Sequence, residues 1–177
     1  MPGLPPFDRD LAGPASIEAP VSLRSFTTSS TRETLDLAAS LGGILEGGES
    51  IALVGELGSG KTTFTKGLCR GLGVVDTRIV SSPTYVLEQI YVARLTVHHY
   101  DLYRLSSADE FLALGFEERI GAGRVVVIEW ADRASSLLPP GRLIVEIRRP
   151  PGGGGDDART IALSGTTPAW SRKLSCL

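Results

Sequence analysis

The chain has 177 residues, of which 42% are hydrophobic and 21% are charged, and its net charge at pH 7 is −2. This length and composition are typical of one globular domain that buries a core of its own. The negative net charge argues against a protein whose main role is to grip nucleic acid by its phosphates, and no apolar run is long enough for a transmembrane helix.

Residues 1–20 are rich in Pro, Gly and Ala, which predicts a disordered N-terminal extension. Its first residues carry prolines and acids where a secretory signal needs basic residues and an apolar segment, so we expect a cytoplasmic protein. The two cysteines, Cys69 and Cys176, are too few for a disulfide framework or a metal cluster, and we expect both to be free thiols.

An edge strand is predicted at Ser22–Thr28, followed by a helix that Ser30 and Glu33 open as a capping box. Apolar residues at helical spacing give this helix one buried face. They are Leu37, Ala38, Leu41, Ile44 and Leu45. We expect the helix to end at Glu46–Gly48, just before the next strand.

The stretch that follows, IALVGELGSGKTTF, contains the strongest chemical signal of the chain. The apolar run Ile51–Val54 predicts a buried strand, and Gly55, Gly60, Lys61 and Thr62 fit the phosphate-loop pattern G-x-x-x-x-G-K-[ST]. Glycines let the backbone N–H groups wrap around an anion. The following helix directs its positive end at the same place, so the pattern predicts a nucleotide site rather than an ordinary strand-to-helix turn.

In the helix after this loop, Phe64 and Leu68 are expected to pack inward, and Gly71 and Gly73 to stop the helix. The segment Ser81–Thr84 then predicts a turn lined with hydroxyl groups. A Thr or Ser placed here in a phosphate-loop protein can sense the γ-phosphate. The pattern alone leaves this switch and a plain solvated turn equally open.

Two strands, Tyr85–Tyr91 and Arg94–Tyr100, are predicted from their β-branched and aromatic residues, and the short gap between them favours an antiparallel hairpin. His98 and His99 then lie on opposite faces of the second strand, so at most one of them can face a site. For each, a packed or surface histidine is the simpler interpretation.

Asp101 ends this strand among tyrosines, where its carboxylate either caps a turn or meets a metal-bound water near the phosphates. A second capping box, Ser107 with Glu110, opens a helix that runs to Gly115.

The continuous apolar run Arg124–Trp130 is typical of a central parallel strand covered on both faces. Its acid, Glu129, lies where phosphate-loop proteins place a second carboxylate directed at Mg²⁺. Because Asp is usual at this position, we expect Glu129 to contact the metal through water rather than directly.

Two further strands, Leu143–Ile147 and Thr160–Leu163, are predicted on either side of the Gly-rich turn Gly152–Gly155. No clear element is predicted after Ser164. The chain therefore divides into an extension at 1–20, a domain at 21–165 and a C-terminal tail at 166–177.

Four motifs, GELGSGKTTF, SSPTYVLEQIY, HHYDLYRL and VVVIEW, occur in this order and together resemble the TsaE family of bacterial ATPases, formerly called YjeE. The similarity covers roughly Ser25 to Ile147. It implies an α/β fold: a single P-loop NTPase domain with a mixed, mainly parallel central sheet and an antiparallel hairpin. It also implies support of N6-threonylcarbamoyladenosine formation in tRNA, in which TsaE binds a TsaD-type and a TsaB-type protein and hydrolyses ATP.

The resemblance assigns roles to single residues. Thr62 and Glu129 are the Mg²⁺ residues, Asp101 is needed for turnover, and Thr84 is the switch position. The cofactor-binding residues that it implies are Thr31 on the base side of the nucleotide, the loop residues Leu57, Gly58, Ser59, Gly60, Lys61 and Thr62, and Trp130 beside the metal carboxylate.

The predicted activity is thus Mg²⁺-dependent ATP hydrolysis, in which Lys61 neutralises phosphoryl charge and Asp101 positions the attacking water. Arg104 and Arg133 are the candidates for an arginine finger, neither clearly placed, so turnover without a partner is expected to be slow. tRNA is expected to take part only indirectly. The alternatives are a small-molecule kinase, for which the chain lacks an arginine-rich lid segment, and a nucleotide-dependent scaffold without useful turnover.

Overall fold

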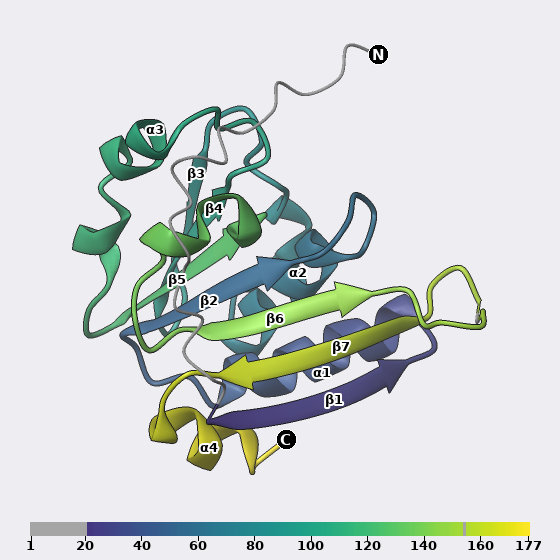
Figure 1. Ribbon diagram of the computed structural model, residues 1–177. Coiled ribbons are helices and arrows are strands. Elements are labelled where there is room, and N and C mark those ends of the chain that lie inside the picture. The colour runs from purple at the N-terminus through teal and green to yellow at the C-terminus, as the bar shows by residue number, and fades with distance from the viewer. Residues whose placement is uncertain (1–20, 154) are drawn as a thin grey trace.

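The computed structural model describes residues 21–153 and 155–177. The predicted extension at 1–20 lies outside these residues. In the described part, a seven-stranded sheet has the order β1-β7-β6-β2-β5-β4-β3 (Figure 1). The strands are β1 (Ser22–Thr28), β2 (Glu49–Val54), β3 (Glu88–Tyr91), β4 (Thr96–Asp101), β5 (Arg124–Glu129), β6 (Leu143–Arg148) and β7 (Arg159–Gly165). The helices are α1 (Thr31–Gly43), α2 (Lys61–Gly71), α3 (Ala108–Ala113) and α4 (Pro168–Leu174), and the 3-10 segments are η2 (Thr77–Ile79), η3 (Phe116–Arg119) and η4 (Ala131–Leu137).

The four middle strands, β6, β2, β5 and β4, are parallel, whereas β1, β7 and β3 pair with their neighbours antiparallel. The predicted α/β fold with a mixed, mainly parallel sheet is therefore confirmed, as is the antiparallel hairpin, formed by β3 and β4. Since parallel strands all end at one edge of a sheet, β2, β4 and β5 deliver the residues that follow them to the same place.

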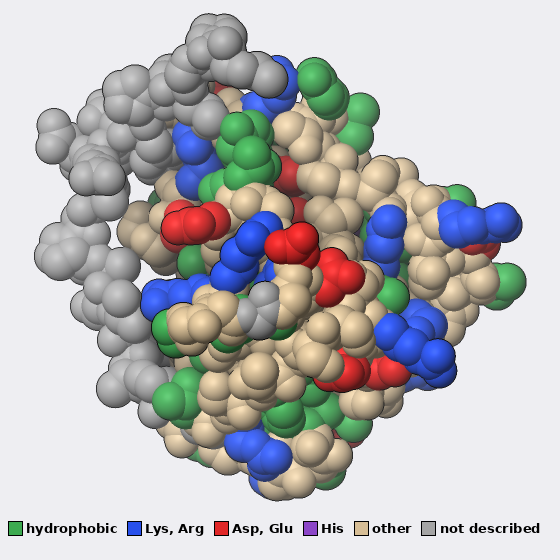
Figure 2. All heavy atoms as spheres, turned by 90° about the vertical axis from the view of Figure 1, so that its right-hand side faces the viewer, with side chains coloured by type: hydrophobic (Ala, Val, Ile, Leu, Met, Phe, Trp, Pro, Cys, Tyr) green, Lys and Arg blue, Asp and Glu red, His purple; other side chains and the backbone are tan. Residues whose placement is uncertain are grey.

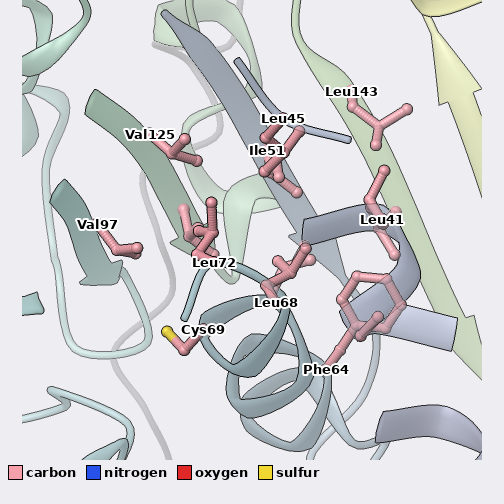
Figure 3. Close-up of a cluster of buried hydrophobic side chains, with 14 of the residues drawn as sticks. Leu41, Leu45, Ile51, Phe64, Leu68, Cys69, Leu72, Val97, Val125 and Leu143 are labelled. Carbon is pink, nitrogen blue, oxygen red and sulfur yellow. The ribbon is translucent and has the colours of Figure 1, made fainter. Parts of the chain in front are cut away.

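Strand β5 is buried on both faces, as its unbroken apolar run predicted. Val125 and Val127 belong to the core beneath α1 and α2, whereas Val126 and Ile128 belong to the core on the opposite face. Figure 3 shows the first core, in which side chains of α1 and α2 meet those of β2, β4, β5 and β6. The second core is covered by α3, η3 and η4. This double covering holds the carboxyl end of β5 in a fixed position.

Both predicted serine caps form, but each Glu carboxylate accepts from the amide before the N-cap, Ser29 or Ser106, and not from the N-cap amide of a full capping box. Ser30 Oγ accepts a hydrogen bond from the amide of Glu33 at 3.2 Å, and Ser107 Oγ accepts one from the amide of Glu110 at 3.2 Å. The first of these caps places Thr31 at the start of α1. Helix α1 ends at Gly43, several residues before the predicted stop. Cys69 is buried and Cys176 is exposed, and both are free thiols as expected.

Two further predictions about secondary structure were wrong. The strand predicted from Tyr85 begins only at Glu88, because the amide of Leu87 donates to the Pro83 carbonyl at 2.7 Å and closes a turn, and Leu87 has a φ of 65°. The residues just before β3 therefore form a loop beside the ends of the central strands.

The second wrong prediction is the lack of an element after Ser164, where α4 forms instead. Pro168 lies in the first turn of α4, a position that suits proline because its missing N–H would have no helical partner. Trp170 and Leu174 bury one face of this helix, and Trp170 Nε1 donates to the Gly141 carbonyl at 2.8 Å. Among the described residues, no helix is long and apolar enough to cross a membrane.

Candidate functional site: a phosphate loop with two carboxylates

The phosphate loop, residues 55–62, connects β2 to α2 at the carboxyl edge of the parallel strands. Gly55 and Gly60 have φ values of 153° and 108°, which residues with a Cβ rarely adopt. A Cβ at Gly55 would also lie 2.4 Å from the carbonyl oxygen of Ile147. Among the described residues, no group accepts from the amides of Gly58 and Gly60. The first amides of α2 are likewise free by helix geometry. These donors suit an anion.

Lys61 is the first residue of α2, and its side chain is bonded to the backbone of the loop. Its Nζ donates to the carbonyl oxygens of Gly55 at 2.6 Å and Glu56 at 2.9 Å. The same atom is 3.6 Å from the centroid of the Trp130 ring, a cation–π contact. Burial lowers the pKa of Lys61, and the nearby Glu129 carboxylate opposes that shift. The ammonium group of Lys61 therefore lies against the backbone of the phosphate loop in a partly desolvated position.

Glu129, the last residue of β5, is 2% exposed and lies beneath the start of α2. Its Oε2 accepts from Thr62 Oγ1 at 3.0 Å. Its Oε1 is 2.9 Å from His99 Nε2 and 3.3 Å from Thr65 Oγ1. Because an ionised carboxylate only accepts hydrogen bonds, the proton of this pair lies on Nε2 of His99. Glu129 is therefore fixed by groups from both α2 and β4.

Asp101, the last residue of β4, is paired in register with Glu129 and is 1% exposed. Its Oδ2 accepts from the hydroxyl of Ser82 and, at 3.1 Å, from that of Thr84. Its Oδ1 accepts from the amide of Tyr103 at 2.8 Å. The loop that the sequence analysis interpreted as either a switch or a solvated turn thus contacts the second carboxylate of the site directly.

An aromatic pair forms one wall of the site. Trp130 follows β5 with a φ of 57°, a left-handed conformation that is uncommon for a residue with a side chain. Its ring centroid lies 4.9 Å from that of Tyr103. The turn at Trp130 therefore brings the indole between Lys61 and Tyr103 instead of continuing the strand.

These groups surround a cavity of about 470 Å³. Every predicted site residue except Ser59 lines it, namely Thr31, Leu57, Gly58, Gly60, Lys61, Thr62, Thr84, Asp101, Glu129 and Trp130. Ser59 instead lines a neighbouring cavity of about 520 Å³ on the other side of the loop, between Gly55 and the end of β6. Figure 2 faces this end of the molecule, where basic and acidic side chains lie interspersed. The structure thus brings the predicted residues together, while their roles stay predictions.

The donor set fits Mg²⁺ bound with a phosphate ligand. Within residues 21–153 and 155–177, no group of three or more His, Cys, Asp or Glu side chains is arranged to hold a metal ion by itself. Thr62 and Glu129 supply one hydroxyl and one carboxylate. Mg²⁺ prefers such hard oxygen ligands, and it usually takes one or two from protein and the others from water and substrate phosphates.

Sequence reasoning missed several residues of the site. Ser82, Tyr103, Asp157 and Arg159 line the cavity, and His99 supports Glu129 from behind. Ser82 was part of the predicted hydroxyl turn, but no sequence signal pointed to Asp157 or Arg159, which come from the opposite end of the chain.

The two arginines named as candidate fingers are placed elsewhere. Arg104 lies over the Tyr85 ring, with 4.2 Å from Cζ to the centroid, and Arg133 donates to the Leu105 carbonyl at 2.9 Å. Neither is among the residues of the described chain that line the cavity, whereas Arg159 is.

Comparisons with known proteins agree with this architecture. The family model "Threonylcarbamoyl adenosine biosynthesis protein TsaE" matches residues 28–156. The tRNA threonylcarbamoyladenosine biosynthesis protein TsaE of Treponema pallidum is 39% identical over 119 residues, which are 67% of this chain and 87% of that protein. Its counterpart in Bacillus subtilis is 38% identical over 138 residues, 77% of this chain and 82% of that protein. The crystal structure of Bacillus subtilis YdiB superposes with a TM-score of 0.69 at 30% identity, covering 87% of this chain and 93% of that one.

Proposed function

The chain belongs to the TsaE family, and from this premise we propose that it is a Mg²⁺-dependent ATPase of tRNA threonylcarbamoyladenosine biosynthesis. It acts in the cytoplasm on a complex of TsaD-type and TsaB-type proteins and meets tRNA only through them. The observation that carries the proposal is the placement of Asp101 and Glu129, in register on neighbouring strands, around one cavity with Lys61 and Thr62.

The phosphate loop binds the triphosphate. The free amides of Gly58, Gly60 and the first turn of α2 donate to phosphate oxygens. Lys61 exchanges its bonds to the carbonyls of Gly55 and Glu56 for the β- and γ-phosphates, which is favourable because its buried ammonium then meets a full negative charge instead of backbone dipoles. Thr31, at the start of α1, lines the same cavity, and we assign it to the base side of the nucleotide.

Thr62 and Glu129 would hold Mg²⁺. When bound, the ion neutralises charge on the β- and γ-phosphate oxygens. The hydroxyl of Thr62 and the Oε2 of Glu129 already contact each other at 3.0 Å, and His99 fixes the other oxygen of the carboxylate. These contacts keep the two groups that would hold the metal side by side.

Asp101 positions the attacking water. Its Oδ2 accepts hydrogen bonds from Ser82 and Thr84. When these hydroxyls turn toward the γ-phosphate, the carboxylate becomes free to accept a hydrogen bond from water. In the step, a bond forms between the water oxygen and the γ-phosphorus, and the bond from that phosphorus to the β–γ bridging oxygen breaks. Asp101 accepts the proton that the water releases.

A partner completes the site. Of the described arginines only Arg159 lines the cavity, and four backbone carbonyls accept its hydrogen bonds. No arginine finger is therefore in place within the described chain. A finger or an ordered switch supplied in trans accelerates related enzymes by about 10³ to 10⁵, so we expect slow turnover alone and fast turnover in the complex.

A phosphate-release assay tests the proposal. Wild type and Lys61→Ala are compared alone, with candidate small-molecule acceptors, and with purified TsaD-type and TsaB-type proteins. We expect release from ATP that rises with the two proteins and is lost in Lys61→Ala. Phosphate transferred to an acceptor would instead identify a kinase, and nucleotide binding without release in every arm would identify a scaffold.

A further inference from the structure

Two cations hold the backbone of the phosphate loop, one at each end. Lys61 bonds to the carbonyl oxygens of Gly55 and Glu56. Arg159 holds the other end, with Nε 2.6 Å from the Ser59 carbonyl oxygen and Nη2 3.2 Å from that of Gly58. Two side chains thus hold the loop backbone, one at residues 55–56 and the other at residues 58–59.

The Arg159 guanidinium is itself fixed. Its Nη1 donates to the carbonyl oxygens of Asp156 and Ala158, each at 2.7 Å. Arg159 is the first residue of β7 and pairs in register with Thr28 of β1. The side chain is therefore a rigid brace from the sheet to the loop, because both its backbone and its outer nitrogen atoms are held.

Holding a carbonyl also orients the next amide. The peptide unit is planar and trans, so the N–H of residue i+1 points opposite to the C=O of residue i. The bond from Arg159 to the Ser59 carbonyl thus fixes the amide of Gly60. That amide needs an external hold, because Gly60 has a φ of 108° and no side chain that restricts rotation. Gly60 is also the residue from which α2 begins.

The hydrogen bonds of the two cations respond differently when a nucleotide binds. Lys61 leaves its carbonyls for the phosphates, whereas Arg159 keeps its bonds. Resting on the proposed nucleotide binding, we infer that Arg159 is a positioning residue that keeps the amides of the phosphate loop converged on the phosphate groups. It acts through the backbone and does not act as an arginine finger.

Arg159→Ala separates these two roles. A brace serves the diphosphate and the triphosphate alike, so the affinities for ADP and for a slowly hydrolysed ATP analogue should fall by the same factor, about 10- to 100-fold for the loss of charged hydrogen bonds. The value of kcat at saturating ATP should change little. Arg159→Lys should recover part of the affinity, and millimolar guanidinium should restore binding to Arg159→Ala.

Arg94→Ala is the matched control. Arg94 precedes β4 at the opposite edge of the sheet and donates to the carbonyls of Gly42, Gly43 and Leu45. It is also a guanidinium bonded to several carbonyls of a distant segment. Its removal should lower the melting temperature without changing nucleotide affinity.

Amide order in the ligand-free protein gives a second readout. In Arg159→Ala, the NMR order parameter of the Gly60 amide should fall from about 0.85 toward 0.6 or below. Unchanged order at Gly60, unchanged affinity for both nucleotides, or a loss confined to kcat would each overturn the inference. If wild type bound neither nucleotide, the proposed function would fail, and the order of Gly60 would still decide whether Arg159 braces the loop.

Discussion

Glu129 and Asp101 end neighbouring strands and are paired in register, yet their surroundings differ in kind. Thr62 and Thr65 of α2 and His99 of β4 contact Glu129, so residues of regular secondary structure hold both of its carboxylate oxygens. The contacts of Asp101 come from Ser82 and Thr84, in the loop before β3, and from the amide of Tyr103.

This difference indicates that the two carboxylates have different roles in the reaction. A carboxylate fixed by helix and strand suits a metal, whose ligands must keep their geometry throughout the reaction. A carboxylate held by hydroxyls of a loop can exchange those partners when the loop moves, which suits a group that meets water only once ATP is bound. We therefore expect substitutions around Glu129 to change the Mg²⁺ requirement and substitutions around Asp101 to change kcat.

Asp101→Asn should have the largest effect. The amide keeps the size of the side chain but removes the negative charge that orients and deprotonates water, so kcat should fall by about 10² to 10⁴. The affinity for ADP and the Mg²⁺ concentration at half-maximal rate should stay near their wild-type values. Steady-state phosphate release with the partner proteins measures kcat and its magnesium dependence. Calorimetry measures the affinity for ADP. A kcat within twofold of wild type would remove Asp101 from the chemical step.

Glu129→Gln should mainly raise the Mg²⁺ requirement. The substitution replaces a negatively charged carboxylate next to the metal with a neutral amide. The Mg²⁺ concentration at half-maximal rate should therefore increase by about 10- to 100-fold, and much of kcat should be recovered at high Mg²⁺. A magnesium titration of the ATPase rate measures this. An unshifted titration curve would contradict the metal role of Glu129.

His99→Phe should produce a weaker form of the same change. It removes the donor that is 2.9 Å from Glu129 Oε1, and loss of a group that orients a metal ligand costs about tenfold in metal affinity. His99→Gln, whose amide nitrogen can take the place of Nε2, should restore the wild-type titration. If His99→Phe changed only thermal stability and left the magnesium titration intact, His99 would be a packing residue.

Thr84→Val should have the smallest effect, and it should affect kcat only. It removes one hydroxyl from Asp101 Oδ2, and one hydrogen bond of about 1 kcal/mol corresponds to roughly fivefold in rate. Thr84→Ser should recover the rate. A shift of the magnesium titration in Thr84→Val would erase the distinction between the two carboxylates.

Much of this arrangement follows from local sequence. The glycine spacing of 55–60 and the apolar run that ends at Glu129 predicted the edge of the sheet where the site lies, because each is a short-range pattern with one geometric solution. The strand alternation predicted that at most one of His98 and His99 could face the site, with a packed or surface histidine as the simpler interpretation for each. Both are buried, and His99 contacts Glu129. The alternation could not show that the partner of His99 is Glu129.

The residues that were missed depend on long-range geometry. Arg159 reaches Ser59 across 100 positions of sequence, and no local pattern encodes that contact. The residues near Tyr85 were assigned to a strand from their side chains, but the bond from Leu87 to the Pro83 carbonyl overrides that preference. In α4, the proline at the first turn and the four-residue spacing of Trp170 and Leu174 are local signals of a helix, although no element was predicted there.

The central claim, that the phosphate loop with Lys61 and a divalent ion binds the phosphates of a nucleotide, is tested most directly by calorimetric titration of the purified protein with ATP and Mg²⁺. We predict saturable binding at one site per chain, weakened when Mg²⁺ is chelated and lost in Lys61→Ala. The absence of any binding heat for the wild type with both ATP and ADP, across a range of temperatures, would contradict the claim.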